Sequence, residues 1–437
     1  PSANGHPGIH HVMGRTIKDT FLRYKTMKGF QVKRKAGWDT HGLPVELSVE
    51  KNLGITKEDI GKKISVDDYN DACRKNVMMY TDEWAQLTDK MGYWVDLDNP
   101  YITYDNKYIE TLWYLLKKLY EKNLLYKGYT IQPYSPAAGT GLSSHELNQP
   151  GCYRDVKDTT VTAQFYVDNA CQVLGEAFKD EKVYALAWTT TPWTLPSNTA
   201  LCVGPKIDYV AVRGNNPYTN ESAVFILAEA RLNAYFTPAK DDDGNVLPFD
   251  IVWKGKGADI VGLHYKQLMP WVKPCALENG EIVVKEDEAF RVIPGDYVTT
   301  EDGTGIVHIA PTFGADDAKV AKDAGIPSLF ILDKGGDTRP MVDFQGKYFE
   351  KNDIDTCFLE KCVNESYWKH SGDYVKNAYD PKYNVDGKYD EKAAAKEMDL
   401  NVVLCLEMKE EGSAFKIEKH VHNYPHCWRT DKPVLYY

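Results

Sequence analysis

The residue pattern of the chain changes near Asp155, and this change limits the fold more than any other feature does. Before it, apolar residues recur at intervals of three and four over residues 11–28, which predicts an amphipathic helix. A short strand is expected to follow over residues 30–34. The pattern then stays helical over residues 56–126, with Asp105 as the expected N-cap of a helix. The first part of the chain is therefore predicted to be rich in helices.

After Asp155, short β-branched and aromatic runs alternate with Gly, Pro and Asn, and this alternation is typical of strands and turns. Strands are expected over residues 161–167, 183–188, 209–212, 223–227 and 414–421. This pattern indicates a separate β-rich domain.

We expect three regions along the chain: a first domain over residues 1–155, an inserted β-rich domain over residues 156–412, and a return segment over residues 413–437. Within the insertion, residues 364–411 are crowded with Tyr, Lys and Asp. This irregular stretch predicts either a helical excursion or a loose surface insertion. The sequence starts with Pro1 and stops directly after a strand-like run, so we expect both ends to cut through an element.

Length and composition describe a globular protein. The chain has 437 residues, enough for roughly two to four domains. Hydrophobic residues make up 43% and charged residues 26%. No apolar run approaches the ~20 residues of a membrane helix, and no secretory signal is visible. A cytoplasmic location is therefore expected. Nine cysteines without a CxxC pair predict reduced thiols.

A loop rich in Gly and His precedes the first predicted helix. It reads Ala3-Asn4-Gly5-His6-Pro7-Gly8-Ile9-His10-His11. Such a loop can bring a phosphate to backbone N–H groups and to the positive end of the helix dipole, while imidazoles donate hydrogen bonds to it. Taken alone, adjacent histidines before a helix are more often a cap or a solvated turn.

A second motif, Gly37-Trp38-Asp39-Thr40-His41-Gly42-Leu43-Pro44-Val45-Glu46, follows the predicted strand. The order of loop, helix, strand and decapeptide resembles the class I aminoacyl-tRNA synthetases, specifically the isoleucyl-tRNA synthetases, along essentially the whole chain. The resemblance implies an α/β fold. Its expected form is a Rossmann-type parallel-sheet half-domain with an inserted β-rich editing domain, in the N-terminal part of a longer enzyme.

The resemblance also implies roles for residues of the first domain. Gly8, His10 and His11 occupy the family's ATP-binding His-Ile-Gly-His motif, in which only His11 matches cleanly. Either His6 or His10 is the candidate for the missing imidazole. Asp39 lies where the family holds the α-ammonium group of isoleucine, a task that a carboxylate performs through charge-assisted hydrogen bonds. The alternative is that Asp39 caps a turn.

Two further segments resemble the editing pocket of the same family. The first runs from Trp188 to Asn198 and contains consecutive threonines, and the second runs from Gly303 to Asp317. The resemblance implies that Asp317 binds the α-ammonium group of a mischarged aminoacyl ester and that His308 excludes the larger isoleucine side chain. Thr190, Thr191 and Asn198 are expected to position the ester and its attacking water. The alternatives are a β-branched edge strand, a core histidine and a helix cap.

The family's zinc site is altered in this sequence. Family members often hold zinc between two Cys pairs, but here the corresponding stretches are residues 133–140, which lack Cys, and His426-Cys427-Trp428-Arg429-Thr430. One thiolate does not make a tetrahedral site, so we expect no zinc. A loop like Lys-Met-Ser-Lys-Ser is also absent from the sequence. We therefore expect the chain by itself to lack synthetic activity.

The prediction is thus an ATP- and Mg²⁺-dependent ligase of isoleucine and tRNA(Ile) that acts through isoleucyl-adenylate and hydrolyses Val-tRNA(Ile) in its inserted domain. Its expected partners are tRNA(Ile), isoleucine and ATP, without a membrane, and it is expected to be a monomer. Two rivals are a free-standing deacylase and a noncatalytic tRNA-binding module. A net charge of −11 argues against nonspecific coating of nucleic acid.

Overall fold

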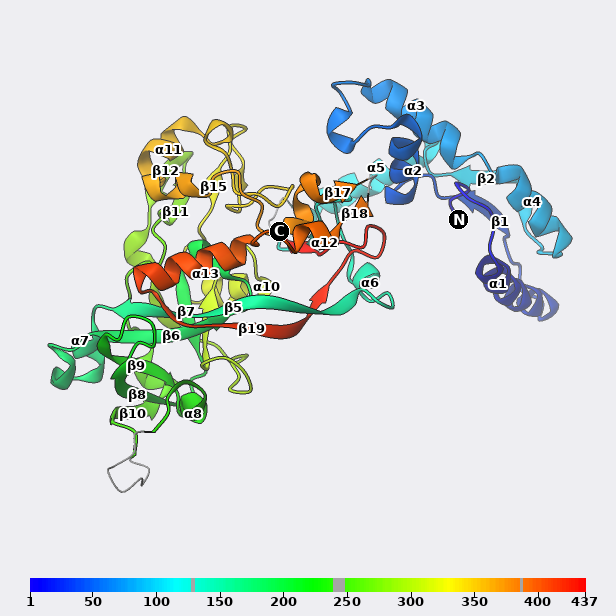
Figure 1. Ribbon diagram of the computed structural model, residues 1–437. Helices are drawn as coiled ribbons and strands as arrows, with labels where there is room; N and C mark the ends of the chain where they lie inside the picture. The colour runs from blue at the N-terminus through cyan, green and yellow to red at the C-terminus, as the bar shows by residue number, and fades with distance from the viewer. Residues whose placement is uncertain (127–129, 239–247, 386–387) are drawn as a thin grey trace. The chain divides into compact units, whose positions relative to one another are not determined.

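A computed structural model describes residues 1–126, 130–238, 248–385 and 388–437, and it divides the chain into two compact units, Pro1–Tyr129 and Thr130–Tyr437 (Figure 1). The division differs from the expected boundary at residues 155/156. That boundary falls inside strand β5 (Tyr153–Val167), which belongs wholly to the second unit.

The first unit holds two parallel strands connected by helices. Its elements are α1 (Ile9–Met27), β1 (Lys35–Trp38), α2 (Leu43–Leu53), η1 (Lys57–Asp59), α3 (Val66–Val77), α4 (Thr81–Lys90), β2 (Asp96–Ile102) and α5 (Asn106–Glu121). Strand β1 pairs in parallel with β2, with Trp38 opposite Ile102. A parallel pair with a helical crossover is the unit of a Rossmann-type sheet, as predicted.

Three details of the first unit bear on the sequence predictions. The helix expected over residues 11–28 is confirmed as α1, and Asp105 directly precedes α5. The strand expected over residues 30–34 is wrong, because the ladder begins at Lys35. Strand β2 interrupts the stretch that was predicted to be helical throughout.

The apolar faces of α1 and α5 lie open. Within the described residues, neither helix buries any of its side chains. Phe21 of α1 is 65% exposed and Trp113 of α5 is 69% exposed. The apolar spacing predicted α1 correctly, although the residues that carry this spacing, Met13, Ile17, Phe21 and Tyr24, are all exposed.

A six-stranded sheet forms the centre of the second unit. Its strand order is β10 (Ile251–Lys256), β8 (Asp208–Asn215), β9 (Ser222–Ala228), β6 (Val183–Thr189), β5 and β19 (Ala414–Pro425). Strands β6 and β9 are parallel, and the other neighbours are antiparallel. The five expected strand segments lie inside β5, β6, β8, β9 and β19, which confirms a β-rich domain.

A smaller sheet packs against the same core and carries the candidate site. It consists of β13 (Arg291–Pro294), β7 (Ala200–Val203) and β14 (Ile306–Ile309), in that order. The 3-10 helix η3 (Pro192–Ser197) connects β6 with β7, and helix α10 (Ala315–Asp323) follows β14. Val161 and Phe165 of β5 share one buried cluster with Leu201 of β7 and Ile306 of β14, so the two sheets have a common core.

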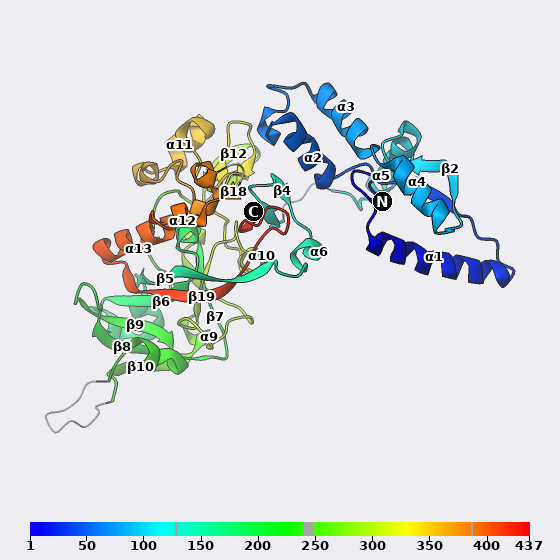
Figure 2. The same ribbon diagram turned by 45° about the vertical axis from the view of Figure 1, so that its right-hand side comes forward.

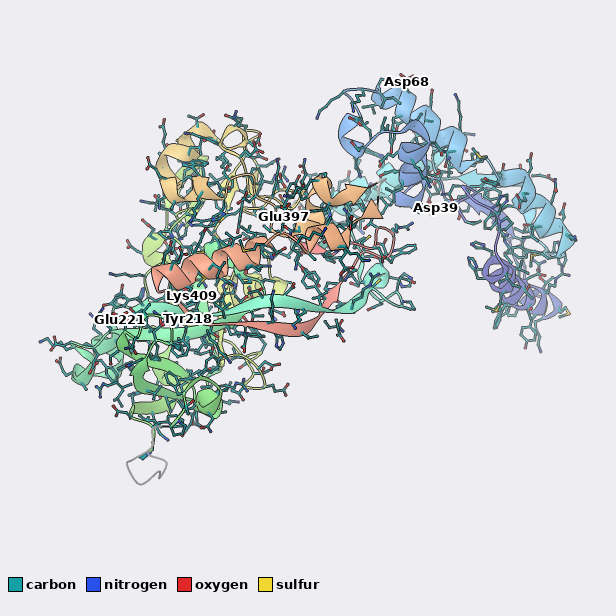
Figure 3. All side chains as sticks on the ribbon, viewed as in Figure 1. Asp39, Asp68, Tyr218, Glu221, Glu397 and Lys409 are labelled. Atoms are coloured by element: carbon teal, nitrogen blue, oxygen red, sulfur yellow. The ribbon has the colours of Figure 1, made fainter. Side chains whose placement is uncertain are left out.

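The irregular stretch 364–411 is substantially helical rather than loose. It contains η7 (Glu365–Lys369), η8 (Asn377–Tyr379), η9 (Pro381–Tyr383), β17 (Asn384–Val385), β18 (Lys388–Tyr389), α12 (Glu391–Ala394) and α13 (Leu400–Glu411); residues 386–387 lie outside the described residues. Helix α13 lies along β5 and β19 in both views, with Leu404 and Met408 fully buried (Figures 1 and 2). Lys409 places Nζ 4.9 Å from the ring centre of Tyr218 (Figure 3).

The return segment also belongs to the second unit. Strand β19 pairs with β5 from Ala414 to Pro425, and β20 (Leu435–Tyr436) pairs with β3 (Pro133–Ser135). The other elements of this unit are β4 (Thr140–Gly141), α6 (Ser144–Leu147), α7 (Ala170–Leu174), η2 (Glu176–Phe178), η4 (Glu229–Arg231), α8 (Leu232–Tyr235), α9 (Gly257–Ile260), β11 (Cys275–Glu278), β12 (Glu281–Val284), η5 (Glu286–Glu288), β15 (Ile331–Leu332), β16 (Thr338–Arg339), η6 (Lys351–Asp353) and α11 (Thr356–Cys362).

Candidate active site

A cavity of about 460 Å³ in the second unit brings together most of the predicted editing residues. Thr190, Thr191, His308 and Asp317 all line it. The threonines lie between β6 and η3, the histidine lies on β14, and the aspartate lies in the first turn of α10. Segments about 120 residues apart in the sequence thus meet in one cavity, as the two motifs predicted.

The threonine-rich turn is held by hydrogen bonds at both of its ends. The backbone N–H of Thr191 donates to the Thr189 hydroxyl over 3.1 Å, where β6 ends. Two residues later, the N–H of Trp193 donates to Asn401 Oδ1 of α13 over 3.1 Å, and the Tyr348 hydroxyl donates to the Trp193 carbonyl over 2.6 Å. The turn is therefore fixed by the core and by the irregular stretch, not by local sequence alone.

His308 is a buried, neutral wall of the cavity. Its position opposite Leu201 in the β14–β7 ladder fixes its backbone, and the side chain leaves the residue only 8% exposed. Burial lowers the pKa of His308 to about 4. Nε2 lies 2.9 Å from the Thr194 hydroxyl, and Nδ1 lies 3.2 Å from the amide nitrogen of Asn198. Both ring nitrogens are thus engaged with the protein.

Asn198 is placed behind the cavity rather than on its surface. Its amide nitrogen donates to the Ala200 carbonyl over 2.8 Å, and Oδ1 accepts from the Tyr265 hydroxyl over 2.7 Å. It is 2% exposed and is not among the residues that line the cavity. Its polar atoms are thus already used in the core, and its expected role in positioning the ester and the water stays a prediction.

Asp317 is held by the turn that follows His308. Its Oδ2 accepts a 2.9 Å hydrogen bond from the N–H of Ala310, which comes directly after β14. A Cβ on Gly314 would lie 2.7 Å from Cγ of Asp317, so a larger residue there would displace the carboxylate. Burial raises the pKa of Asp317 to about 6 against the opposing effect of this hydrogen bond.

The charges around the cavity favour a cationic ligand group. Asp302 and Asp317 are among the described residues that line it, whereas no Lys or Arg is. A carboxylate near a protonated amine gains a charge-assisted hydrogen bond, more so where water is excluded. The arrangement can therefore hold an ammonium group near Asp317 with hydroxyl groups nearby.

Several lining residues were not predicted from the sequence. Thr194 contacts His308 and lies inside the same threonine motif as Thr190 and Thr191. Its position in that motif could have marked it as a site residue. Tyr424 of β19 and Tyr436 of β20 line the cavity from the return segment. No local pattern marks these tyrosines, because pairing with distant strands brings them there.

In the first unit, the Gly8–His11 loop forms the N-terminus of α1. The N–H of Gly8 donates to His11 Nδ1 over 2.9 Å, and the His10 ring centre lies 3.8 Å from that of His11. A Cβ on Gly8 would lie 2.8 Å from Cε1 of His10, so the His10 ring occupies the space beside the missing side chain. His6 instead lies 2.8 Å from the Glu83 carboxylate. Of the two candidate imidazoles, His10 is the one beside Gly8.

Asp39 lies at the carboxyl end of β1, the edge where open parallel sheets bind ligands (Figure 3). It is exposed, and its N–H donates to the Pro1 carbonyl over 3.0 Å. The N–H of His41 is 3.5 Å from Asp39 Oδ1, which is a weak cap at best. The next residue, Thr40, donates its N–H to the Thr103 hydroxyl over 2.9 Å at the same edge.

The residues around Cys427 do not fit zinc. Cys427 is buried in an apolar cluster with Leu142, Leu147 and Val434, none of which can bind a metal ion. Across the described ranges, no group of three or more His, Cys, Asp or Glu is arranged to hold a metal. Among all the residues that the structure describes, no helix is both long and apolar enough to cross a membrane.

Comparisons with known proteins agree with the sequence motifs. Residues 1–192 match the family described as tRNA synthetases class I (I, L, M and V). The chain is 66% identical over 446 residues to the isoleucine–tRNA ligase of Bacteroides thetaiotaomicron, 60% over 450 residues to that of Porphyromonas gingivalis, and 42% over 437 residues to that of Clostridium tetani. These alignments cover 100% of this chain and 38%, 37% and 34% of the respective relatives.

Solved structures of editing domains show weaker likeness. The cytosolic leucyl-tRNA synthetase editing domain of P. knowlesi is 19% identical with a TM-score of 0.28, covering 38% of this chain and 62% of that one. The corresponding P. falciparum domain is 15% identical with a TM-score of 0.29, and the match covers 41% of this chain and 77% of that one. Likeness at such TM-scores establishes neither fold nor function.

The chain spans little more than a third of the length of the relatives that it matches. Within that span the identity runs along the whole chain, and the class I family match covers its first unit. Over its whole length the chain is thus similar to isoleucine–tRNA ligases, and its residues 1–192 match the class I tRNA synthetases.

Proposed function

We propose that the second unit hydrolyses the ester of Val-tRNA(Ile), within a longer enzyme that ligates isoleucine to tRNA(Ile). The observation that supports this proposal is the cavity in which an aspartate able to bind an ammonium group, a neutral histidine and two threonines converge. Asp317 binds the α-ammonium group of the aminoacyl ester, and His308 limits the space for its side chain. Thr190 and Thr191 position the ester and the water.

The reaction needs no protein base at His308. Water attacks the ester carbonyl carbon, the bond to the ribose oxygen breaks, that oxygen takes a proton, and valine and tRNA are released. Because both nitrogens of His308 are engaged with protein partners, the ring acts through its shape. Placement and hydrogen bonding of the reactants supply the acceleration.

A physical argument explains why an enzyme that ligates isoleucine needs a second, hydrolytic pocket. One methylene changes the binding free energy in an apolar pocket by only about 1–3 kcal/mol, and isoleucine and valine are the standard illustration of this limit. A synthetic site cannot reject the smaller valine by size, whereas a second pocket can reject the larger isoleucine.

For the longer enzyme, we propose synthesis of isoleucyl-adenylate from isoleucine and ATP with Mg²⁺, followed by transfer to tRNA(Ile). Asp39 then binds the isoleucine α-ammonium group, and Gly8, His10 and His11 contact ATP. That the 437 residues alone form no adenylate stays a prediction, and isoleucine-dependent pyrophosphate exchange tests it. We also propose a cytoplasmic monomer; all nine cysteines are free thiols, which suits a reducing compartment.

The deciding experiment measures release of valine and isoleucine from Val-tRNA(Ile) and Ile-tRNA(Ile) by this chain. Selective release of valine is expected. Equal release from both esters would contradict the assignment of His308 as the size-limiting wall, and release from neither would remove the support for hydrolysis by this unit.

A further inference from the structure

A chain of buried hydrogen bonds runs behind the cavity wall. The Tyr265 hydroxyl lies 2.7 Å from Asn198 Oδ1, Asn198 Nδ2 lies 3.2 Å from His308 Nδ1, His308 Nε2 lies 2.9 Å from the Thr194 hydroxyl, and that hydroxyl lies 2.8 Å from the Thr191 carbonyl. Tyr265, Asn198, Thr194 and His308 are each at most 8% exposed. Unmade hydrogen bonds are costly in such surroundings, so each proton has one favourable place.

The direction of every bond follows from its fixed ends. Besides His308, Asn198 Nδ2 faces the carbonyls of Ala200 at 2.8 Å and Ile309 at 3.4 Å. Carbonyls only accept, so the amide nitrogen must point toward them. Its two N–H groups then donate to the Ala200 carbonyl and to His308 Nδ1, the two nearest of the three acceptors. The His308 proton is then on Nε2 and is donated to Thr194. The Thr194 hydroxyl in turn donates to the Thr191 carbonyl.

We infer that Tyr265 is a positioning residue of this site, because its hydroxyl holds the Asn198 amide that keeps His308 in the Nε2–H tautomer and in one ring orientation. The low pKa of His308, which burial causes, agrees with a neutral ring. A further consequence, that Tyr265 affects the choice between valine and isoleucine esters, rests on the proposed hydrolysis of aminoacyl esters. The assigned tautomer of His308 does not depend on that proposed function.

The first test reads the tautomer directly by nitrogen-15 NMR of the histidine side chains at neutral pH, with His308→Gln identifying the signal. The wild-type chain is expected to show Nε2–H; a proton on Nδ1 would overturn the inference. Tyr265→Phe keeps the ring against Phe165, at 5.2 Å between ring centres, but removes the donor. It is expected to mix the two tautomers, and an unchanged pure Nε2–H signal would overturn the role of Tyr265.

A matched control is Tyr367→Phe. Tyr367 is also fully buried, and its hydroxyl donates to the Phe349 carbonyl over 2.9 Å, away from His308. The His308 signal of the Tyr367→Phe variant is expected to match that of the wild type. A second variant, Asn198→Asp, replaces the donor with an acceptor of the same shape and is expected to move the proton to Nδ1. If the His308 proton stays on Nε2 in Asn198→Asp, the assigned direction of the hydrogen bond from Asn198 Nδ2 to His308 Nδ1 is contradicted.

The second test measures substrate choice. In Tyr265→Phe the ratio of Val-tRNA(Ile) to Ile-tRNA(Ile) hydrolysis is expected to fall about tenfold, the effect of one lost buried hydrogen bond, with a smaller change in kcat for the valine ester. Tyr367→Phe keeps the ratio. A folded Tyr265→Phe protein with an unchanged ratio would refute the consequence for substrate choice. If the wild type hydrolyses neither ester, the proposed function fails, and the NMR test still decides the positioning role.

Discussion

The Asp317 carboxylate accepts a 2.9 Å hydrogen bond from the N–H of Ala310, the residue that directly follows strand β14. This bond closes the turn between the strand that carries His308 and the helix that carries Asp317. It uses Oδ2, and no hydrogen bond joins Oδ1 to another group in the described ranges. One turn therefore fixes both predicted recognition groups and keeps one carboxylate oxygen for a ligand.

Asp317→Asn is expected to reduce kcat/KM for Val-tRNA(Ile) hydrolysis about 10- to 100-fold, because a hydrogen bond to a charged partner is replaced by a neutral one. The fold should persist, since the Asn carbonyl oxygen still accepts from Ala310. Asp316→Asn is the matched control, because Asp316 is exposed in the same first turn of α10. Unchanged hydrolysis in Asp317→Asn would contradict the ammonium-binding role of Asp317, whereas a noncatalytic tRNA-binding module would show no hydrolysis even in the wild type.

The pH dependence of hydrolysis should carry the signature of Asp317. The carboxylate form binds the ammonium group, and the Asp317 pKa is about 6, so kcat/KM is expected to rise as pH increases through about 6. It should fall again near pH 8, where an α-amino group loses its proton. His308, with a pKa of about 4, stays neutral throughout this range. In Asp317→Asn the acidic limb should disappear; if it remains, another group is responsible.

Local sequence patterns predicted those elements in which the spacing of apolar residues matches the face that is buried. The runs over residues 161–167 and 223–227 are strands, because apolar side chains there fill one core from two sheets. Strand β2 was missed, since residues 96–102 contain Asp, Asn and Pro and gain strand geometry only by pairing with β1. Local pattern does not encode such a partner.

The candidate site shows the same division. His308 and Asp317 were predicted together and line one cavity. Asn198 was predicted to position the ester and its water, and in the structure its amide is held by partners in the core, among them Tyr265, 67 residues further along the chain. Tyr424 reaches the cavity through the pairing of β19 with β5, which joins segments more than 250 residues apart. Residue type indicates what a side chain can do, whereas its direction depends on the tertiary partner.

The link between α13 and the threonine turn gives a prediction for the stretch that the sequence left unexplained. Asn401→Leu removes the acceptor for the Trp193 N–H without changing the side-chain size much. It is expected to lower the free energy of unfolding by about 1–2 kcal/mol and to slow hydrolysis, because a buried N–H loses its partner. Thermal unfolding and valine release measure the two effects.

Asn401→Asp is the conservative counterpart. It keeps an acceptor, and its charge lies near the N-terminus of α13, where the helix dipole favours it. It should retain more stability and more hydrolysis than Asn401→Leu. Equal losses in both variants would mean that the hydrogen bond to Trp193 does not support the turn.

Metal analysis tests the altered zinc motif. Because Cys427 packs with Leu142, Leu147 and Val434, purified protein is expected to hold no stoichiometric zinc, and EDTA is expected to leave Tm unchanged. Stoichiometric zinc, or a lower Tm after chelation, would contradict this prediction. Cys427→Ala should cost stability through lost packing rather than through lost metal.

Trp84 offers a test of the loop proposed to contact ATP. It is 2% exposed, its indole N–H donates to the Gly5 carbonyl over 2.8 Å, and the His11 ring centre lies 4.6 Å from its own. Trp84→Phe keeps an aromatic ring but removes this donor, so the first unit is expected to lose about 1–3 kcal/mol of stability. Amide hydrogen exchange should become faster over residues 3–11.

Trp113→Phe is the control for this change, since Trp113 is 69% exposed and its replacement removes little packing. If exchange over residues 3–11 is the same in Trp84→Phe as in the wild type, the loop holds its form without Trp84. Faster exchange in Trp84→Phe alone would mean that the conformation of the Gly8–His11 loop depends on a tryptophan more than 70 residues away, so that Trp84 supports the loop proposed to contact ATP from outside it.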